Sequence, residues 1–167
     1  MFLRKGVILP ECVSCHFNLH FPYRATATKC VETKECSAYE VICTNADYEV
    51  RHYNASKWVS TSVQSYFMEM AAYDGFRKLF KYIKGANADG VHIDMTSPVL
   101  IKKPEARNMW EPVHFLEMPE MHAYVKSFGG WMLSVNTKLY SILLSRELNA
   151  ASASYNTTFY YGAGYNR

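Results

Sequence analysis

The sequence predicts an α+β fold in which two helices lie on one side of an antiparallel sheet. Three observations predict it: several segments alternate apolar and polar residues, two longer segments have helical apolar spacing, and the order strand–helix–strand occurs twice. With 49% hydrophobic and 20% charged residues the chain has a globular composition. Its 167 residues fit a single domain.

The first predicted strands are residues 39–44, 48–53 and 57–63. Residues 45–47 (Asn-Ala-Asp) are typical of a turn. Strand 48–53 alternates, which places Tyr48, Val50 and His52 on one face and makes the strand half-buried. We expect residues 57–63 to be its antiparallel partner.

Residues 68–84 form the clearest helix, and Gly85 ends it as a glycine after a helix does. Its predicted packed face carries Ala72, Phe76, Leu79, Phe80 and Ile83. Residues 91–96 alternate as a further strand, and Pro98 marks an edge, a bulge or a break.

The remainder begins with residues 104–119, which contain three prolines and are predicted to be irregular. Residues 121–128 form a strand that Gly129 and Gly130 end. A second helix over 134–148 has Ser134 as its N-cap, and residues 158–165 form a final strand. The apolar residues of this helix are Val135, Leu139, Ile142, Leu143 and Leu148.

Residues 1–29 are expected to be a leader outside the folded domain, with no good signal peptide. Residues 12–16 (Cys-Val-Ser-Cys-His) match the pattern for covalent haem attachment, and His20 could instead complete a zinc site. Because nothing around them would form a pocket, we interpret the match as chance.

The cysteines and glycosylation motifs bear on the compartment. All five cysteines lie within the first 43 residues. The spacing of Cys30 and Cys36 allows a small disulfide loop in an oxidising compartment. Asn54 and Asn156 begin N-glycosylation motifs. These features favour secretion, with a cytoplasmic location as the alternative.

Several function classes are excluded on composition and motifs. A net charge of +3 is too small to indicate a nucleic-acid partner, and no apolar run is long enough to span a membrane. No catalytic motif is present, and the six histidines are dispersed. The residues alone therefore indicate a non-enzymatic binding domain with many aromatic side chains.

Five stretches, in this order, resemble the SOUL haem-binding family. They are residues 48–53 (YEVRHY) with 57–61, residues 76–83 with 85–87, residues 93–99 (IDMTSPV), residues 124–130 (YVKSFGG) and residues 160–165 (YYGAGY). The resemblance covers a domain over 30–167. It implies a distorted antiparallel β-barrel with two flanking helices, built from two pseudo-repeated halves. Relative to the family, one internal strand between Lys103 and Val113 and the C-terminal strand are expected to be missing.

The resemblance also implies non-covalent binding of haem or another tetrapyrrole in an apolar groove beside the first helix. Phe76 and Phe80 would contact the porphyrin, and Arg77, Lys78 and Lys81 would pair with its propionates. The alternative is that both phenylalanines are core residues and the cations a solvated face. His52 is either an axial ligand of the haem iron or a surface histidine.

Two further expectations come from relatives of the family. Vertebrate members are linked to cell-death signalling through the second helix, which corresponds here to residues 139–147, so a protein-interaction module with weak or no haem binding is the alternative function. Secreted members have a cysteine pair before the first strand. A Cys30–Cys36 disulfide is predicted on that basis, against two reduced thiols in a cytosolic tail.

Overall fold

The computed structural model describes residues 5–10, 37–103 and 112–165, which form two compact units. One unit contains six strands and one helix, and the other contains two strands and one helix. Every strand pair among the described residues is antiparallel. The predicted α+β class with two helices is therefore confirmed.

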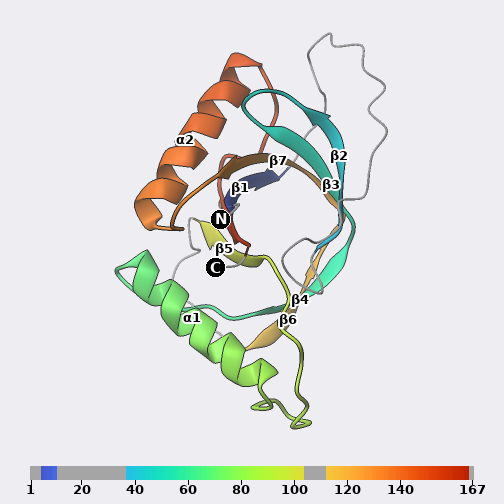
Figure 1. Ribbon diagram of the computed structural model, residues 1–167, viewed down its shortest axis with the longest axis vertical. Coiled ribbons are helices and arrows are strands. Elements are labelled where there is room, and N and C mark those ends of the chain that lie inside the picture. The colour runs from blue at the N-terminus through green and yellow to red at the C-terminus, as the bar shows by residue number, and fades with distance from the viewer. Residues whose placement is uncertain (1–4, 11–36, 104–111, 166–167) are drawn as a thin grey trace. The chain divides into compact units, whose positions relative to one another are not determined.

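The first unit is built on a six-stranded sheet with the order β2-β3-β7-β1-β8-β5 (Figure 1). Its strands are β1 (Lys5–Pro10), β2 (Tyr39–Thr44), β3 (Glu49–Tyr53), β5 (Val99–Lys103), β7 (Met121–Phe128) and β8 (Tyr160–Gly164). The predicted strands 39–44 and 121–128 are confirmed at both ends. The pairs that the described strands form do not close this sheet into a barrel.

Strand β1 lies inside this sheet, paired with β7 on one side and β8 on the other. Val7 is fully buried and Ile8 nearly so, on opposite faces of the sheet. The expectation that residues 1–29 lie outside the folded domain is therefore wrong for Lys5–Pro10. Residues 11–29, with the Cys12–His16 pattern and His20, lie outside the described residues. The short apolar run around Val7 is a central strand because both of its faces are covered.

Helix α2 (Ser134–Ala150) packs against β7 and β1 (Figure 1). Its buried residues are Thr137, Ser141, Leu144 and Leu148, at helical spacing. Of the predicted packed face, Leu148 is buried as expected, but the prediction is wrong for Val135, Leu139 and Ile142, which are 72%, 49% and 55% exposed.

The physical reason lies in the two buried hydroxyls of α2. Thr137 Oγ1 donates to Leu133 O at 3.0 Å, and Ser141 Oγ donates to Lys138 O at 2.8 Å, so burying them leaves no hydroxyl unpaired. The methyl group of Thr137 approaches Gly162 on β8, where an added Cβ would lie 3.5 Å away. Leu133 is the N-cap residue, so the predicted capping by Ser134 is also wrong.

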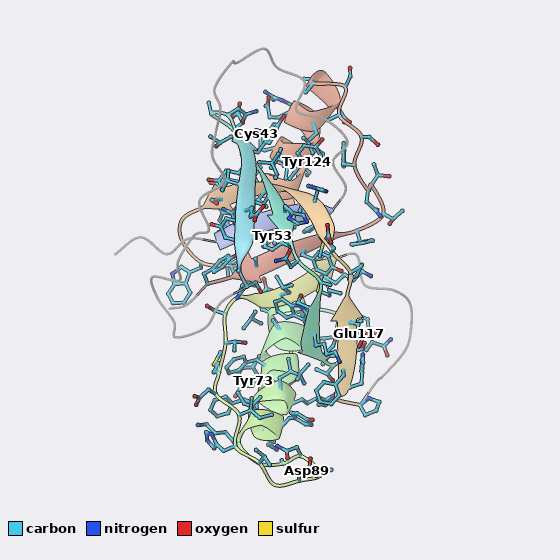
Figure 2. The ribbon with its side chains drawn as sticks, turned by 90° about the vertical axis from the view of Figure 1, so that its right-hand side faces the viewer. Cys43, Tyr53, Tyr73, Asp89, Glu117 and Tyr124 are labelled. Carbon is cyan, nitrogen blue, oxygen red and sulfur yellow. The ribbon has the colours of Figure 1, made fainter. Side chains whose placement is uncertain are left out.

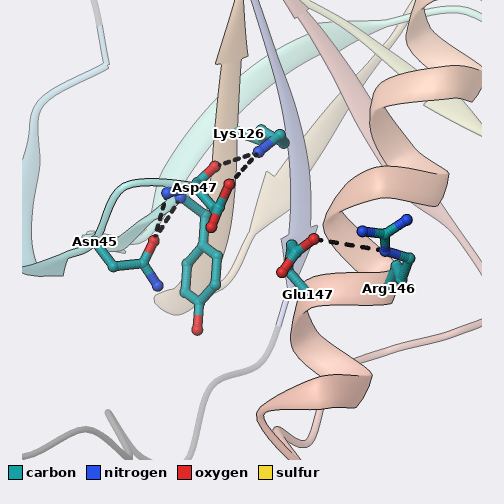
Figure 3. A network of polar contacts seen from close by, with 6 residues as sticks. Asn45, Asp47, Lys126, Arg146 and Glu147 are labelled. Carbon is teal, nitrogen blue, oxygen red and sulfur yellow. Dashed lines mark hydrogen bonds and ion pairs between the residues drawn. The ribbon is translucent and has the colours of Figure 1, made fainter.

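The turn predicted at residues 45–47 joins β2 to β3 (Figure 3). Asn45 Oδ1 accepts hydrogen bonds of 2.8 Å from the backbone N–H groups of Asp47 and Tyr48. Lys126, on β7, donates to the Asp47 carbonyl at 2.7 Å and lies 3.5 Å from its carboxylate. The Asn45 side chain therefore makes the turn, and Lys126 fastens it to the sheet.

The second unit contains β4 (Ser56–Ser60), α1 (Met68–Ile83) and β6 (His114–Met118). Strand β4 pairs with β6, so the predicted pairing of residues 57–63 with 48–53 is wrong. Both edges of β3 are already occupied, by β2 and β7. The segment 104–119, predicted to be irregular, contains this strand.

Residues 91–96 do not form the predicted strand. They carry a single bridge, between Lys84 and His92, and their apolar side chains Val91, Ile93 and Met95 are exposed. The strand of this region, β5, begins immediately after Pro98. The alternation of residues 91–96 does not produce a strand because none of the strands that the structure describes pairs with this segment. Within the described part of the chain, neither helix has the length and apolar character needed to cross a bilayer.

Candidate functional site

Helix α1 turns its small residues inward and its large aromatic residues outward. Ala71 is buried, and a Cβ added to Gly75 would lie 3.4 Å from Val63 Cγ2, so the helix packs closely on the segment after β4. Glu69 in the first turn and Lys81 in the last complement the helix dipole, and Gly85, at φ +103°, ends the helix. The side of α1 opposite to Ala71 and Gly75 is therefore available to contact a ligand.

Tyr73, Phe76 and Phe80 form the aromatic face of α1. Phe76 and Phe80 are 40% and 39% exposed, and their rings stack with centroids 5.7 Å apart and an angle of 21° between the planes. Tyr73 is exposed one turn earlier (Figure 2), and Met70 extends the apolar surface. The prediction that Phe76 and Phe80 belong to a packed face is therefore wrong in this structure. A flat apolar ligand would find an exposed aromatic surface there.

Two cations lie against rings of the aromatic face. The Arg77 guanidinium is 5.6 Å from the Tyr73 ring centre, and Lys84 Nζ is 5.6 Å from the Phe80 ring centre. Lys84 Nζ also donates to His92 Nε2 at 3.0 Å. Lys81 is exposed on the same helix. The aromatic face thus offers both apolar contact and positive charge, which suits a planar ligand with carboxylate groups.

His52 lies on β3 in the first unit, with only 17% of its side chain exposed. Its Nε2 is 2.9 Å from Glu120 Oε1, and its Nδ1 is 4.0 Å from Glu40 Oε2. The His122 ring, opposite it on β7, is 4.8 Å away between centroids. Ligation of iron through Nε2 would require the contact with Glu120 to open.

The predicted site residues fall into two groups. Phe76, Arg77, Phe80 and Lys81 are together on α1 in the second unit, whereas His52 belongs to the first. The prediction omitted Tyr73 and Lys84, which continue the spacing of Phe76 and Phe80 in both directions along the helix and could have been found from it. No three ligating side chains among residues 5–10, 37–103 and 112–165 are arranged to hold a metal ion.

A buried arginine stands among tyrosines in the first unit. Arg51 contacts Glu49 Oε2 through Nε at 2.8 Å and through a terminal nitrogen at 2.7 Å, and it donates to the Tyr53 hydroxyl at 3.4 Å. Its Cζ lies 4.1 Å from the centre of the Tyr39 ring. Burial alone would lower the pKa of Arg51, but Tyr53, Tyr39 and Glu49 outweigh it and raise that pKa. Strand β3 is therefore covered on both faces, where alternation predicted a half-buried strand.

Tyr165 interacts with Tyr53, Arg51 and Tyr39 of this cluster, and it should make the stability of the fold decrease at alkaline pH. Burial, then Tyr53, raises the pKa of the Tyr165 hydroxyl above its ordinary value of 10.0. The unfolded chain therefore loses this proton first, and stability that is complete below about pH 10 falls as the pH rises further. Above about pH 10, the free energy of unfolding should therefore fall more steeply with pH in the unmodified protein than in Tyr165→Phe. We expect the two slopes to differ by about 1 kcal/mol per pH unit. Urea titrations between pH 8 and 12 measure this difference, with the exposed Tyr66→Phe as the matched control. Equal slopes for all three proteins would contradict it.

Cys43, at the α2 end of the first unit (Figure 2), is disulfide-bonded. The sequence prediction did not include this cysteine. Cys12, Cys15, Cys30 and Cys36 lie outside the described residues, so the Cys30–Cys36 bridge stays a prediction.

Comparison with known proteins gives one family. Residues 34–167 match the model described as SOUL heme-binding protein. Human "Heme-binding protein 2" is 31% identical over 143 residues, which cover 71% of this chain and 70% of the human protein. The mouse protein of that name is 30% identical over 142 residues, covering 71% and 69%. "Heme-binding protein 1" of Xenopus tropicalis is 25% identical over 142 residues, covering 71% and 74%.

Proposed function

Because the chain belongs to the SOUL heme-binding protein family, we propose that it binds haem non-covalently on the aromatic face of α1. The observation that carries this proposal is the exposed, stacked pair Phe76 and Phe80 with Arg77 and Lys84 against the neighbouring rings. A buried phenylalanine pair would support only a structural role. The bound molecule would be carried or buffered, without a catalytic step.

The proposed contacts divide the ligand into two parts. The porphyrin ring would lie against Phe76 and Phe80, where removing apolar surface from water supplies most of the affinity. The two propionates would pair with cations of α1, of which Arg77, Lys78 and Lys81 are the predicted ones and Lys84 an addition. Since neither interaction needs iron, iron-free tetrapyrroles with the same carboxylates should bind as well.

A titration of the full chain with haemin tests the proposal. We expect a saturable shift of the haem absorbance band together with quenching of tryptophan fluorescence. Metal-free protoporphyrin IX should compete for the same site. The absence of saturable binding of either tetrapyrrole would exclude the proposed function.

The environment of His52 leads to a separate prediction. Its Nε2 is held by Glu120 and its ring lies 4.8 Å from the His122 ring, so we expect His52→Ala to leave the spectrum of bound ferric haem unchanged. Difference spectra of the charge-transfer and visible bands make the measurement. The control is His114→Ala, a histidine on β6 of the second unit. A changed spectrum in His52→Ala alone would identify His52 as an iron ligand and contradict this expectation.

A second candidate function rests on the outer side of α2. Leu139 and Ile142, in the segment linked to protein interaction in relatives, are 49% and 55% exposed and so could contact a partner. Under this alternative, expression of the chain in animal cells would reduce their viability, and Leu139→Glu with Ile142→Glu would abolish that effect. If expression has no effect on viability, this alternative is excluded, whatever the haemin titration gives.

A further inference from the structure

Two asparagines in N-glycosylation motifs lie in connections at the surface of the fold. Asn54 stands between β3 and β4, and residues 54–57 are all exposed. Asn156 stands between α2 and β8, followed by the exposed Thr157 and Thr158. Neither residue is part of a helix or strand, so a sugar on either would disturb no backbone ladder.

The hydrogen bonds within the Asn156 motif use the side-chain oxygen of Asn156, so its side-chain nitrogen, Nδ2, can carry a sugar. Asn156 Oδ1 accepts hydrogen bonds from the Thr158 backbone N–H at 2.8 Å and from Thr158 Oγ1 at 2.7 Å. The oxygen of the amide therefore makes the turn, and a glycan attached to Nδ2 would preserve both bonds.

The Asn54 motif tolerates a glycan for a different reason. Its hydroxyl residue, Ser56, already accepts a hydrogen bond of 2.8 Å from Trp58 Nε1 in the folded chain. An oligosaccharide would therefore be transferred to Asn54 on the unfolded chain, before the hydrogen bond between Trp58 and Ser56 forms. The exposed position of Asn54 then leaves the attached sugar in water after folding.

An independent observation concerns the compartment. Cys43 is disulfide-bonded, and disulfides form in oxidising compartments such as the lumen of the endoplasmic reticulum. Transfer of oligosaccharides to asparagine takes place in the same lumen. The disulfide and the two motifs, which come from unrelated parts of the sequence, thus agree on one route.

We propose that Asn54 and Asn156 each carry an N-linked oligosaccharide. In each transfer, Nδ2 attacks C1 of the first sugar of a lipid-diphosphate-linked oligosaccharide. The Nδ2–C1 bond forms, the C1–oxygen bond breaks, the lipid diphosphate leaves with the electron pair, and Nδ2 gives up one proton. No group is oxidised or reduced. This modification is separate from tetrapyrrole binding and does not depend on it.

The test uses the full chain expressed in animal cells and digested with peptide-N-glycosidase F. We expect partial digestion to lower the apparent mass in two steps. Asn54→Gln and Asn156→Gln should each remove one step, and so should Ser56→Ala and Thr158→Ala, which keep the asparagine. Asn149→Gln, outside any such motif, is the control and should keep both steps.

Digestion in ¹⁸O-labelled water adds a direct readout. Each asparagine that carried a sugar becomes an ¹⁸O-containing aspartate, which peptide mass spectrometry detects. Labelling of residues 54 and 156 supports the proposal. A chain whose mass does not change on digestion and that shows no ¹⁸O label overturns the proposal. Labelling at only one of the two asparagines overturns the proposal for the unlabelled one.

Discussion

Replacing Phe76 and Phe80 together by alanine is expected to weaken haemin binding about 30-fold. About two fifths of each side chain is exposed, which is roughly 80 Å² if a whole phenylalanine presents about 200 Å². A porphyrin covering one side of each ring would remove about half of that area from water. At about 25 cal/mol per Å² the two rings together contribute about 2 kcal/mol, or about 30-fold in the dissociation constant.

The measurement is a haemin titration of the double variant beside a matched control. Phe115→Ala removes a more exposed phenylalanine, 70% exposed, from β6 of the same unit and should leave the affinity unchanged. Circular dichroism of each variant establishes that the helix content is preserved. Equal loss of affinity in the double variant and the control would mean that haemin binds exposed apolar surface without a defined site.

Val7→Asp is expected to abolish cooperative folding of the first unit. Val7 is fully buried in β1, where it belongs to the same core cluster as Leu144 and Leu148 of α2. A carboxylate at this position would have to lose its water without a partner, which costs more than about 4 kcal/mol and consumes much of the stability of a domain. A chain that begins at residue 30 lacks β1 altogether and should show the same defect.

Thermal and urea unfolding followed by near-ultraviolet circular dichroism test this prediction. Val135→Asp provides the matched control, because it places the same charge at a position that is 72% exposed on α2. It should leave the unfolding midpoint within a few degrees of that of the unmodified protein. A cooperative transition of unchanged midpoint in Val7→Asp would show that β1 is dispensable.

Local sequence patterns predicted the bounds of those helices and strands that are specified by signals within or next to the segment itself. Strands β2 and β7 were predicted at both ends, and α1 to within one residue, because their apolar spacing, and the glycines that follow β7 and α1, are local signals. Long-range pairing was not predictable in this way. Strand β4 pairs with β6, more than fifty residues later, and no feature of residues 56–60 alone specifies that partner.

The orientation of each helix also escaped prediction, for a physical reason. Hydropathy assigns leucine, valine and phenylalanine to the interior, but α2 buries Thr137 and Ser141, whose hydroxyls bond within the helix. Helix α1 packs closely through Ala71 and Gly75, which leaves its phenylalanines exposed. The candidate site was thus predicted in its residues Phe76, Arg77, Phe80 and Lys81, while the exposure that makes it a candidate came from the structure.

The central position of β1 has a consequence for how the chain is made. Strand β1 leaves the ribosome before its partners β7 and β8, which begin at Met121 and Tyr160. The sheet therefore cannot be completed until β8 has been synthesised, and until then β1 is an apolar strand with two unpaired edges. Contacts of such long sequence separation also slow folding after release. Newly made chains should accordingly depend on a chaperone that shields this strand until translation ends.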